Sequence, residues 1–254
     1  MIIEYRDVDK RFGAQVVLDG VNLSVRRGET LTIVGRSGTG KSVMLKTLTG
    51  LMPVDSGRIL VDGDEVTALD EDDLRGVRRK IGMLFQNAAL FDSMTIFENV
   101  AYPLKEHTDF DEAKRLEVAQ ETLDMVDLRG VEDEFPGELS GGMRKRVGLA
   151  RAIALRPPIV LYDEPTTGLD PITSTVINRL IRRLQERLKI TSIVVTHDLE
   201  SAFMMTDRIA MLHAGKIISV QSVEEFRRAQ DERIHEFATG GLTEQELRFI
   251  GRVL

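Results

Sequence analysis

The chain contains no cysteine, has fewer basic than acidic side chains, and lacks any long apolar run. The absence of cysteine excludes disulfides, thiolate zinc sites and cysteine nucleophiles, and it fits a reducing compartment. No stretch approaches the ~20 uninterrupted apolar residues that a membrane-spanning helix needs. The N-terminal segment, residues 1–7, also lacks the charged-then-apolar order of a signal peptide. We therefore expect the chain to stay on the side of the membrane where it is made.

The net charge of −7 argues against nucleic acid as a partner. A phosphate backbone selects for basic protein surfaces, and this chain is acidic overall. A local basic cluster, Arg144, Lys145 and Arg146, could act alone. We interpret it as the solvated face of a helix and expect no nucleic-acid partner.

The length of 254 residues allows one large α/β domain or two small ones, with ample core. Apolar strands and helical patterns alternate along the chain, which predicts a parallel or mixed sheet covered by helices. Short strands are expected over residues 21–25 and 58–61. The second is followed by Asp62 and Gly63, a strong hairpin signal. The N-terminal part is therefore predicted to form an antiparallel β layer on a parallel core.

The pattern changes to helices between about residues 87 and 154, which predicts a helical subdomain. We expect one nucleotide-binding domain over residues 1–221 and a C-terminal helical extension over 222–254. Capping-box patterns pair Ser222 with Glu225 and Thr243 with Glu246 in that extension. A further helix, capped by Asp170 and Pro171, should carry an apolar stripe formed by Ile172, Val176, Leu180, Leu184 and Leu188.

A phosphate-binding loop runs from Gly35 to Ser42, with the sequence GRSGTGKS. It follows an apolar strand and opens a helix, which is the context that such a loop needs. Its glycines let main-chain amides surround phosphates, and the helix N-terminus favours negative charge. Lys41 should reach the β- and γ-phosphates and the Ser42 hydroxyl should bind Mg²⁺. The residues predicted to bind the nucleotide here are Gly35, Arg36, Ser37, Gly38, Thr39, Gly40, Lys41, Ser42 and Val43.

Two carboxylates, Asp163 and Glu164, follow the apolar strand at residues 159–162. They should emerge at the carboxyl edge of a buried strand, where open α/β sheets bind ligands. Asp163 is predicted to hold Mg²⁺ through its water shell. Glu164 could take a proton from a water molecule lined up on the γ-phosphate. On their own they could be solvated carboxylates; beside a phosphate-binding loop they indicate a hydrolysis site.

Gln86 and His197 each end a predicted strand, at residues 81–85 and 192–195. Gln86 can offer its side-chain carbonyl to the metal and to the attacking water. His197 could contact the γ-phosphate. An isolated Gln or His after a strand is usually a surface residue, but parallel-strand ends meet at the edge that also carries the phosphate-binding loop. We therefore predict a catalytic role for both.

A second glycine-rich segment, Leu139-Ser140-Gly141-Gly142-Met143, precedes a helix expected over residues 143–155. Ser140, Gly141 and Gly142 offer free amides and a hydroxyl, which makes a second anion-binding site. One nucleotide already has its phosphates held by the first loop. The second segment lies across the helical insertion, so we expect it to serve a nucleotide on another copy of the protein.

These motifs, in this order, resemble those of the ABC-type ATPases, from about residue 2 to residue 220. The resemblance implies an α/β P-loop NTPase fold with a RecA-like core, an antiparallel β layer and a helical signature subdomain. It implies a head-to-tail homodimer with two ATP molecules between P-loop and signature segment. The Gly168-Leu169-Asp170 motif assigns Asp170 to the nucleotide site. It also implies that an aromatic residue, here Phe12, stacks on adenine; Phe12 could otherwise be a packed residue of the β layer.

Met143 departs from the family, most of whose members have glutamine at this position. A methionine cannot replace the hydrogen bonds of an amide, but the main-chain and Ser140 contacts survive, so we expect activity to persist. Three segments, GRSGTGKSV, ALFDSMTIFENVAYPL and LSGGMRKRVGLARA, resemble the Mla-type ATPases. Those ATPases work with a permease and MCE-domain proteins to move phospholipids between bacterial membranes.

The resemblance implies that a permease helix docks just after Gln86. Apolar side chains in the segment from Leu90 to Phe97 could receive it, although some belong to the core of the helical subdomain; they are Leu90, Phe91, Met94 and Phe97. We therefore expect the ATPase subunit of a phospholipid transporter, at the cytoplasmic face of the bacterial inner membrane. Two alternatives remain. One is the ATPase subunit of a transporter of amino acids or lipoproteins. The other is a soluble ABC-type ATPase acting on DNA, although the chain lacks the heptads and cysteines typical of that class.

Overall fold

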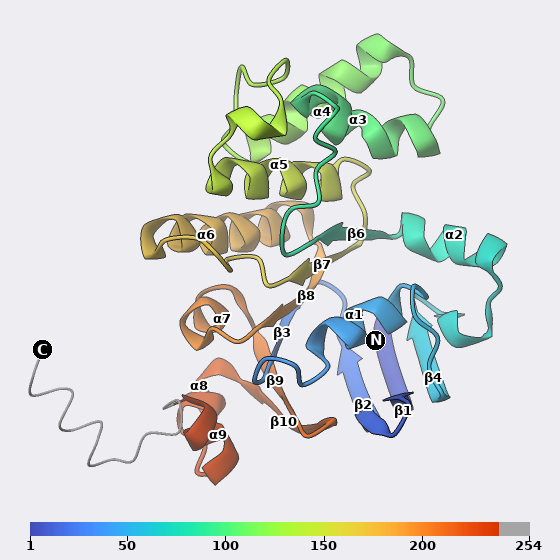
Figure 1. Cartoon of the computed structure of the whole chain (residues 1–254), viewed down its shortest axis with the longest axis vertical. Helices are drawn as coiled ribbons and strands as arrows, with labels where there is room; N and C mark the ends of the chain where they lie inside the picture. Colours follow the sequence, from blue (N-terminus) through green and yellow to red (C-terminus); the bar gives the residue numbers. More distant parts are fainter. Residues whose placement is uncertain (239–254) are drawn as a thin grey trace, which may run out of the picture.

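Two β-sheets and several helices make up residues 1–238, the part of the chain that the computed structural model describes (Figure 1). The central sheet has the strand order β10-β9-β3-β8-β7-β6. Its strands pair in parallel except for β9 with β10. They are β3 (Thr30–Val34), β6 (Ile81–Leu84), β7 (Ile159–Asp163), β8 (Thr191–Thr196), β9 (Arg208–His213) and β10 (Lys216–Ser222). All residues of β3 and β8 are buried, which is typical of a parallel sheet covered on both faces.

The second sheet is antiparallel and confirms the predicted N-terminal β layer, in the order β2-β1-β4-β5. Its strands are β1 (Ile3–Phe12), β2 (Gln15–Val25), β4 (Ser56–Val61) and β5 (Asp64–Glu65). The prediction for residues 21–25 was too short, because β2 is 11 residues long and pairs with β1 through several register shifts. Asp62 and Gly63 both have positive φ, as the predicted hairpin turn requires.

The helices confirm the predicted α/β architecture. They are α1 (Lys41–Leu48), α2 (Glu71–Arg79), α3 (Ile96–His107), α4 (Glu112–Met125), α5 (Gly141–Ile153), α6 (Pro171–Leu188), α7 (Leu199–Met205), α8 (Val223–Arg227) and α9 (Glu232–Ala238). Single 3-10 turns span Val66–Ala68 and Pro136–Glu138. In Figure 1, α3, α4 and α5 gather at one end of the molecule, away from the antiparallel sheet. The phosphate-binding loop precedes α1, whereas the signature segment begins α5 in this helical part, so the two motifs belong to different regions of the fold.

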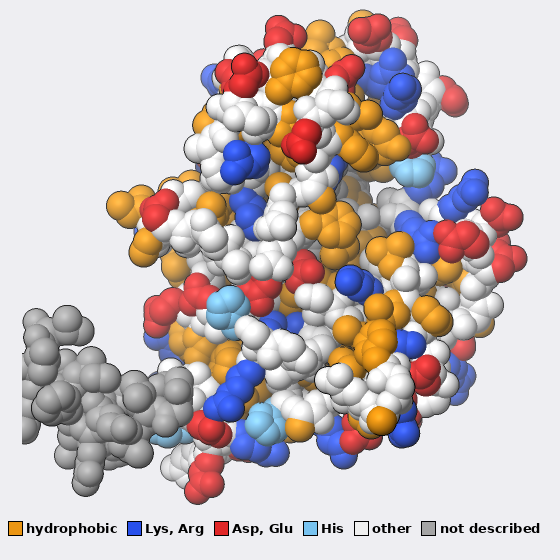
Figure 2. Space-filling view, in the orientation of Figure 1, with side chains coloured by type: hydrophobic (Ala, Val, Ile, Leu, Met, Phe, Trp, Pro, Cys, Tyr) orange, Lys and Arg blue, Asp and Glu red, His pale blue; other side chains and the backbone are white. Residues whose placement is uncertain are grey.

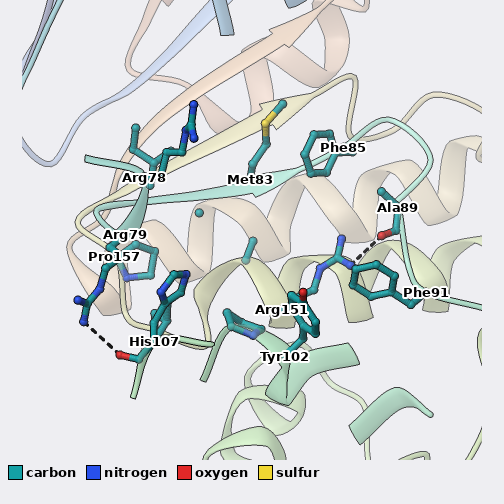
Figure 3. A pocket seen from close by; sticks show the side chains of 15 residues that line it. Arg78, Arg79, Met83, Phe85, Ala89, Phe91, Tyr102, His107, Arg151 and Pro157 are labelled. Atoms are coloured by element: carbon teal, nitrogen blue, oxygen red, sulfur yellow. Dashed lines mark hydrogen bonds between the residues drawn. The ribbon is translucent and has the colours of Figure 1, made fainter. Parts of the chain in front are cut away.

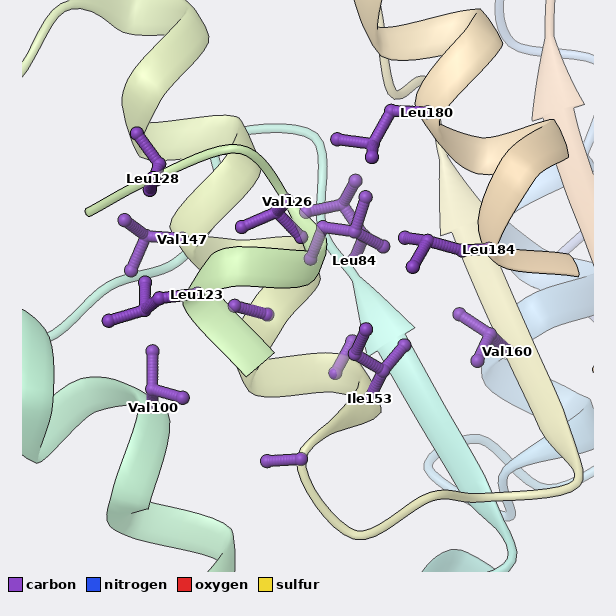
Figure 4. Packing of buried hydrophobic residues seen from close by; sticks show 14 of the residues in the cluster. Leu84, Val100, Leu123, Val126, Leu128, Val147, Ile153, Val160, Leu180 and Leu184 are labelled. Atoms are coloured by element: carbon purple, nitrogen blue, oxygen red, sulfur yellow. The ribbon is translucent and has the colours of Figure 1, made fainter. Parts of the chain in front are cut away.

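Three hydrophobic clusters hold these layers together. The first joins α3, α4 and α5 to β6, β7 and α6, through residues such as Leu123, Val147 and Leu180 (Figure 4). The second fills the space between the antiparallel sheet and the central sheet, around α1. The third lies under α7, α8 and α9, where Phe226 and Ile234 are buried. Each fully buried side chain of this size contributes roughly 1.5–3 kcal/mol.

Helix ends follow the predicted capping patterns where the structure describes them. The Asp170 carboxylate accepts hydrogen bonds from the amides of Ile172 and Thr173, at 3.0 Å each, and Pro171 opens α6. Ser222 and Glu225 form the predicted capping box at the start of α8. The second predicted box, at Thr243 and Glu246, lies outside the described residues. The division at residues 221/222 stays a prediction.

The predicted apolar stripe of α6 is wrong at its first two positions. Leu180 and Leu184 are buried, but Ile172 is 78% exposed and Val176 is 45% exposed. Helical spacing places these side chains on one face, whereas the neighbouring elements cover only the later turns of that face. In Figure 2, hydrophobic side chains lie at the left edge of the molecule, beside α6.

Candidate functional site

The predicted phosphate-binding loop connects β3 to α1 at the carboxyl end of the central sheet. Gly38 and Gly40 have φ angles of +79° and +104°, which L side chains rarely adopt. A Cβ atom at Gly40 would also lie 2.8 Å from Cγ1 of Val17. The glycines therefore allow a loop shape that other residues would prevent.

Lys41 is buried within this loop. Its ammonium group donates hydrogen bonds to the main-chain oxygens of Gly35, at 2.8 Å, and Arg36, at 3.1 Å. Burial lowers the pKa of Lys41, and the carboxylates of Glu164 and Asp163 oppose that shift. Its Nζ lies 3.7 Å from Oε1 of Glu164. The lysine thus stands between the loop and the strand-end carboxylates, where it can turn to phosphate oxygens.

Ser42 and Asp163 meet at the ends of α1 and β7. The Ser42 hydroxyl donates a 2.8 Å hydrogen bond to Oδ1 of Asp163. Burial raises the pKa of Asp163, and this hydrogen bond opposes the rise. A hydroxyl and a carboxylate are hard oxygen donors, so the pair fits Mg²⁺. Within residues 1–238, no group of three or more histidine, cysteine or acidic side chains is placed to hold a metal.

Glu164 follows Asp163 and has a φ of +49°, a conformation uncommon for residues other than glycine. Its main-chain N–H donates a hydrogen bond to the oxygen of Val195 on β8, at 2.9 Å. Its Oε2 accepts a hydrogen bond from the Thr167 hydroxyl at 3.1 Å and lies 2.9 Å from Nδ1 of His197. With Nδ1 protonated, the histidine donates to the carboxylate. The sheet therefore brings two predicted catalytic residues into contact.

A cavity of about 440 Å³ collects ten of the predicted site residues. Val17, which the sequence did not indicate, also lines it. The complete lining is Phe12, Val17, Ser37, Gly38, Gly40, Lys41, Ser42, Val43, Gln86, Glu164 and His197. The predicted residues from five separate segments thus share one cavity, of a size that suits a small-molecule ligand.

The remaining residues of the phosphate-binding loop shape it rather than line the cavity. The Thr39 hydroxyl donates a 2.8 Å hydrogen bond to the main-chain oxygen of Arg36. The Arg36 guanidinium pairs with Glu236 of α9 at 2.6 Å. A Cβ atom at Gly35 would lie 2.5 Å from the main-chain oxygen of Leu212, so a side chain there would displace the neighbouring strand.

Phe12 stands at the rim of this cavity and is 47% exposed. The ammonium group of Lys10 lies 5.5 Å from the centre of its ring. Phe12 is therefore not packed inside the β layer, which was the alternative reading of its sequence position. An exposed ring beside a phosphate-binding loop is suited to stack on a base.

The signature residues Ser140, Gly141 and Gly142 lie at the start of α5, as predicted, although the helix begins at Gly141 and ends at Ile153. Ser140 caps the helix, since its Oγ accepts a 3.3 Å hydrogen bond from the amide of Met143. A Cβ atom at Gly142 would lie 2.5 Å from Cγ2 of Thr173 on α6. Glycine therefore allows α5 and α6 to approach closely.

Asp170 belongs to the same neighbourhood, because it caps α6 beside Thr173. Its capping hydrogen bonds, led by the one from the Thr173 hydroxyl, lower the pKa of this carboxyl group. Neither Asp170 nor the signature residues line the nucleotide cavity described above. Within one chain they form a separate cluster outside that cavity.

The interpretation of residues 144–146 as a solvated basic face is wrong for the middle residue. Arg144 is exposed, but Lys145 is only 5% exposed. Its ammonium group donates hydrogen bonds to the main-chain oxygens of Gln86 and, at 3.3 Å, Glu164. Burial lowers the pKa of Lys145. The sequence contained an indication of this burial. Lys145 lies three residues from both Gly142 and Gly148, and three-residue steps place all three on the same, buried face of α5.

A second cavity, of about 470 Å³, lies between β6, α3 and α5 (Figure 3). It is lined by aromatic and basic side chains, among them Phe85, Phe91, Tyr102, Arg79 and Arg151. The cavity is apolar on most of its surface, and three arginines, Arg78, Arg79 and Arg151, also line it. We call it the aromatic groove.

The four residues predicted to receive a permease helix have different environments. Phe91 is 41% exposed and lines the aromatic groove. Leu90 and Phe97 pack partly on the helical core. Met94 lines a smaller cavity of about 180 Å³ together with Phe97. Phe91 is therefore the one of the four that lines the aromatic groove.

Buried Asn99 fixes the position of Phe91. Its side-chain oxygen accepts a hydrogen bond from the Phe91 amide at 2.8 Å, and its Nδ2 donates to the Phe91 main-chain oxygen at 3.1 Å. Asn99 thus holds both main-chain polar groups of the residue that carries the aromatic ring.

Residues 18–167 match the protein family described as ABC transporter. The chain is 41% identical to the ATP-binding protein of the intermembrane phospholipid transport system of Haemophilus influenzae, over 94% of this chain and 90% of that protein. It is 43% identical to a methionine import ATP-binding protein of Rhizobium johnstonii, over 85% of this chain and 60% of that protein.

A solved structure of an ATP-binding cassette dimer, in a post-hydrolysis state with ADP and Pi, is 35% identical and superposes with a TM-score of 0.80. It covers 87% of this chain, and this chain covers 98% of it. The order of motifs, the shared cavity and these similarities agree. This chain is an ATPase and belongs to the ATP-binding subunits of the ABC transporter family.

Proposed function

We propose that this protein is the ATP-hydrolysing subunit of an ABC transporter that moves phospholipid between bacterial membranes, working with a separate permease and an MCE-domain protein. The observation that carries the proposal is the nucleotide cavity, in which Lys41, Glu164 and His197 meet. The choice of cargo is supported by 41% identity, across 94% of the chain, to a phospholipid transport subunit.

The hydrolysis site is proposed to form between two copies in a head-to-tail dimer. The P-loop cavity of one copy binds ATP, with Phe12 against the adenine. Ser140, Gly141, Gly142 and Asp170 of the other copy close the site over the phosphates. Two observations support this arrangement: the signature cluster lies outside the cavity of its own chain, and a similar cassette has been solved as a dimer.

Within this site, Lys41 binds the β- and γ-phosphates, and the Ser42 hydroxyl, Asp163 and Gln86 would hold Mg²⁺. The metal, when bound, neutralises phosphate charge. Glu164 takes the proton from the attacking water, and its carboxylate is held in place by Thr167 and His197. His197 is also within reach of the γ-phosphate position, at the rim of the same cavity.

The permease is proposed to dock in the aromatic groove. Phe91 and Tyr102 lie with ring centres 5.0 Å apart and provide the apolar floor, while Arg79 and Arg151 line the same groove. A short helix with aromatic or aliphatic residues and a carboxylate would complement this surface. The structure contains no membrane-spanning helix within residues 1–238, and we place the subunit at the cytoplasmic face of the inner membrane, bound through the permease.

Co-expression with a permease and an MCE-domain protein from the same organism tests the proposal. The three proteins should purify together, and ATP should drive transfer of a fluorescent phospholipid between vesicles and the MCE-domain protein. Phe91→Asp should abolish co-purification without changing ATP hydrolysis by the isolated subunit; Phe110→Asp, at an exposed position outside the groove, is the matched control.

Methionine is the second cargo to test, because a methionine import subunit is 43% identical. Methionine-stimulated ATP hydrolysis in the reconstituted complex, without phospholipid transfer, would replace the lipid assignment. Purification with DNA and without a permease would overturn transport altogether.

A further inference from the structure

We propose that Lys145 is a positioning residue for ATP hydrolysis: its ammonium group fixes the main chain at Gln86 and Glu164 together. The proposal rests on the role proposed above for Glu164 as the base. Lys145 does not line the nucleotide cavity, so it acts through the residues that do.

The contacts of Lys145 join three elements. The side chain leaves α5 and is buried between the ends of β6 and β7. Its Nζ donates to the main-chain oxygen of Gln86, just after β6, and to that of Glu164, just after β7. These strands are neighbours in the sheet. One cation therefore ties the helix that begins with the signature segment to two proposed catalytic residues.

The Glu164 peptide needs such support. Its φ of +49° is uncommon for a residue with a side chain, and such conformations persist where the surroundings hold them. The Glu164 amide donates to Val195 on one side, and its carbonyl accepts from Lys145 on the other. The main chain that carries the carboxylate is thus held at both polar groups.

The loop after Gln86 is held by the same face of α5. Ala88 and Ala89 both have positive φ, at 59° and 48°. Arg151 donates to their main-chain oxygens at 2.7 Å each. A Cβ atom at Gly148 would lie 3.1 Å from that of Ala88, so glycine allows the close approach.

Lys145, Gly148 and Arg151 are spaced by three residues, which places them along one side of the helix. Arg151 also lines the aromatic groove, whereas Lys145 lines neither cavity. Lys145 therefore offers a way to perturb the link between α5 and the catalytic residues without touching either binding surface.

Removing the ammonium group would take this donor from the part-buried Gln86 carbonyl and leave the Glu164 carbonyl with the Thr167 amide, at 3.3 Å. Loss of hydrogen bonds from part-buried carbonyls favours rearrangement. The expected movement displaces Glu164 and Gln86 relative to the phosphates. The P-loop contacts of Lys41 and Ser42 do not involve Lys145. Hydrolysis should therefore fall while ATP binding is preserved.

The test compares Lys145→Met with Arg146→Met, in the full chain. Methionine keeps the length and apolar stem of lysine but has no donor. Arg146→Met is the matched control, since it removes one cation from the adjacent position, where the guanidinium donates a hydrogen bond to the main-chain oxygen of Asp127 at 3.0 Å. Lys145→Met should lower kcat about tenfold to a hundredfold, with the Kd of a fluorescent ATP analogue within about twofold of wild type. Arg146→Met should change neither.

Hydrogen exchange gives a readout that does not depend on activity. In Lys145→Met, peptides covering residues 86–89 and 164–167 should exchange faster, while those covering 35–42 should not. Lys145→Arg, which keeps the charge and the donors, should recover most of the lost kcat. If Lys145→Met does not fold, Lys145→Leu, which also has no donor, is measured in the same way, with the same expected loss of kcat at preserved ATP affinity.

A kcat within twofold of wild type for Lys145→Met would overturn the inference. A loss of ATP binding in parallel with kcat would also overturn it, because such a loss indicates that Lys145 only stabilises the fold. The Glu164→Gln variant tests separately whether Glu164 is the base. If Glu164→Gln hydrolyses ATP at the wild-type rate, Glu164 is not the base; if Glu164→Gln is inactive and Lys145→Met is normal, the positioning role alone is wrong.

Discussion

Replacing Glu164 with glutamine removes the proposed base while changing the shape of the site very little. The amide oxygen can still accept the hydrogen bond from Thr167. The same oxygen can accept a hydrogen bond from a protonated Nδ1 of His197, because both contacts of the wild-type carboxylate are made by Oε2. Since the main-chain bond to Val195 is also unaffected, the chain should keep its fold.

The magnitude follows from what the carboxylate is proposed to do. A well-placed general base contributes about 10²–10⁴ in rate, which corresponds to roughly 3–5 kcal/mol in the barrier. The substitution also removes a negative charge 3.7 Å from Lys41, so ATP should bind at least as tightly as in the wild type. We therefore expect a loss of turnover of about 10²–10⁴ together with preserved ATP binding.

Phosphate release measured in a single turnover reports the chemical step, and a fluorescent ATP analogue reports binding. Size-exclusion chromatography with ATP should show more dimer for Glu164→Gln than for wild type, because the closed state no longer turns over. Thr167→Val is the control: it removes a hydrogen bond to the carboxylate but keeps the base, so its loss should be smaller than that of Glu164→Gln. Undiminished phosphate release by Glu164→Gln would refute the assignment.

Three further predictions concern the nucleotide cavity, the second copy and the packing. Lys41→Ala should weaken ATP binding by at least tenfold, as measured by equilibrium titration; unchanged affinity would contradict its contact with phosphate. A mixed dimer of Ser140→Arg and Lys41→Ala subunits should recover one intact site and hydrolyse ATP, whereas neither homodimer should; an inactive mixed dimer would argue against completion across subunits. Gly82→Ala should lower the free energy of unfolding by about 1–3 kcal/mol in urea titrations, because its Cβ would lie 2.0 Å from the main-chain oxygen of Ala152; an unchanged midpoint would show that β6 and α5 separate freely.

The nucleotide cavity could be predicted from the sequence because its signals are local. The glycines before Lys41 and the apolar strand before Asp163 identify their own surroundings. Parallel strands then bring their carboxyl ends to one edge, which placed Gln86 and His197 correctly. Ser42 and Asp163 lie 121 residues apart, yet their contact follows from that single topological rule.

The features that could not be predicted depend on what packs against a segment. Strand β1 is rich in polar residues and is held by its two neighbours, so its own pattern gave little indication of a strand. The burial of Ile172 and Lys145 could not be predicted for the same reason. Ile172 is apolar but exposed, because no element covers it. Lys145 is charged but buried, because two main-chain carbonyls accept its hydrogen bonds.

The end of β6 separates two binding surfaces by a single residue. Phe85 lines the aromatic groove and Gln86, the next residue, lines the nucleotide cavity. Consecutive Cα atoms are only ~3.8 Å apart, and the peptide between them is a rigid plane. A partner that displaces Phe85 in the aromatic groove would therefore also displace Gln86 in the nucleotide cavity. In the same way, a nucleotide that moves Gln86 would move Phe85.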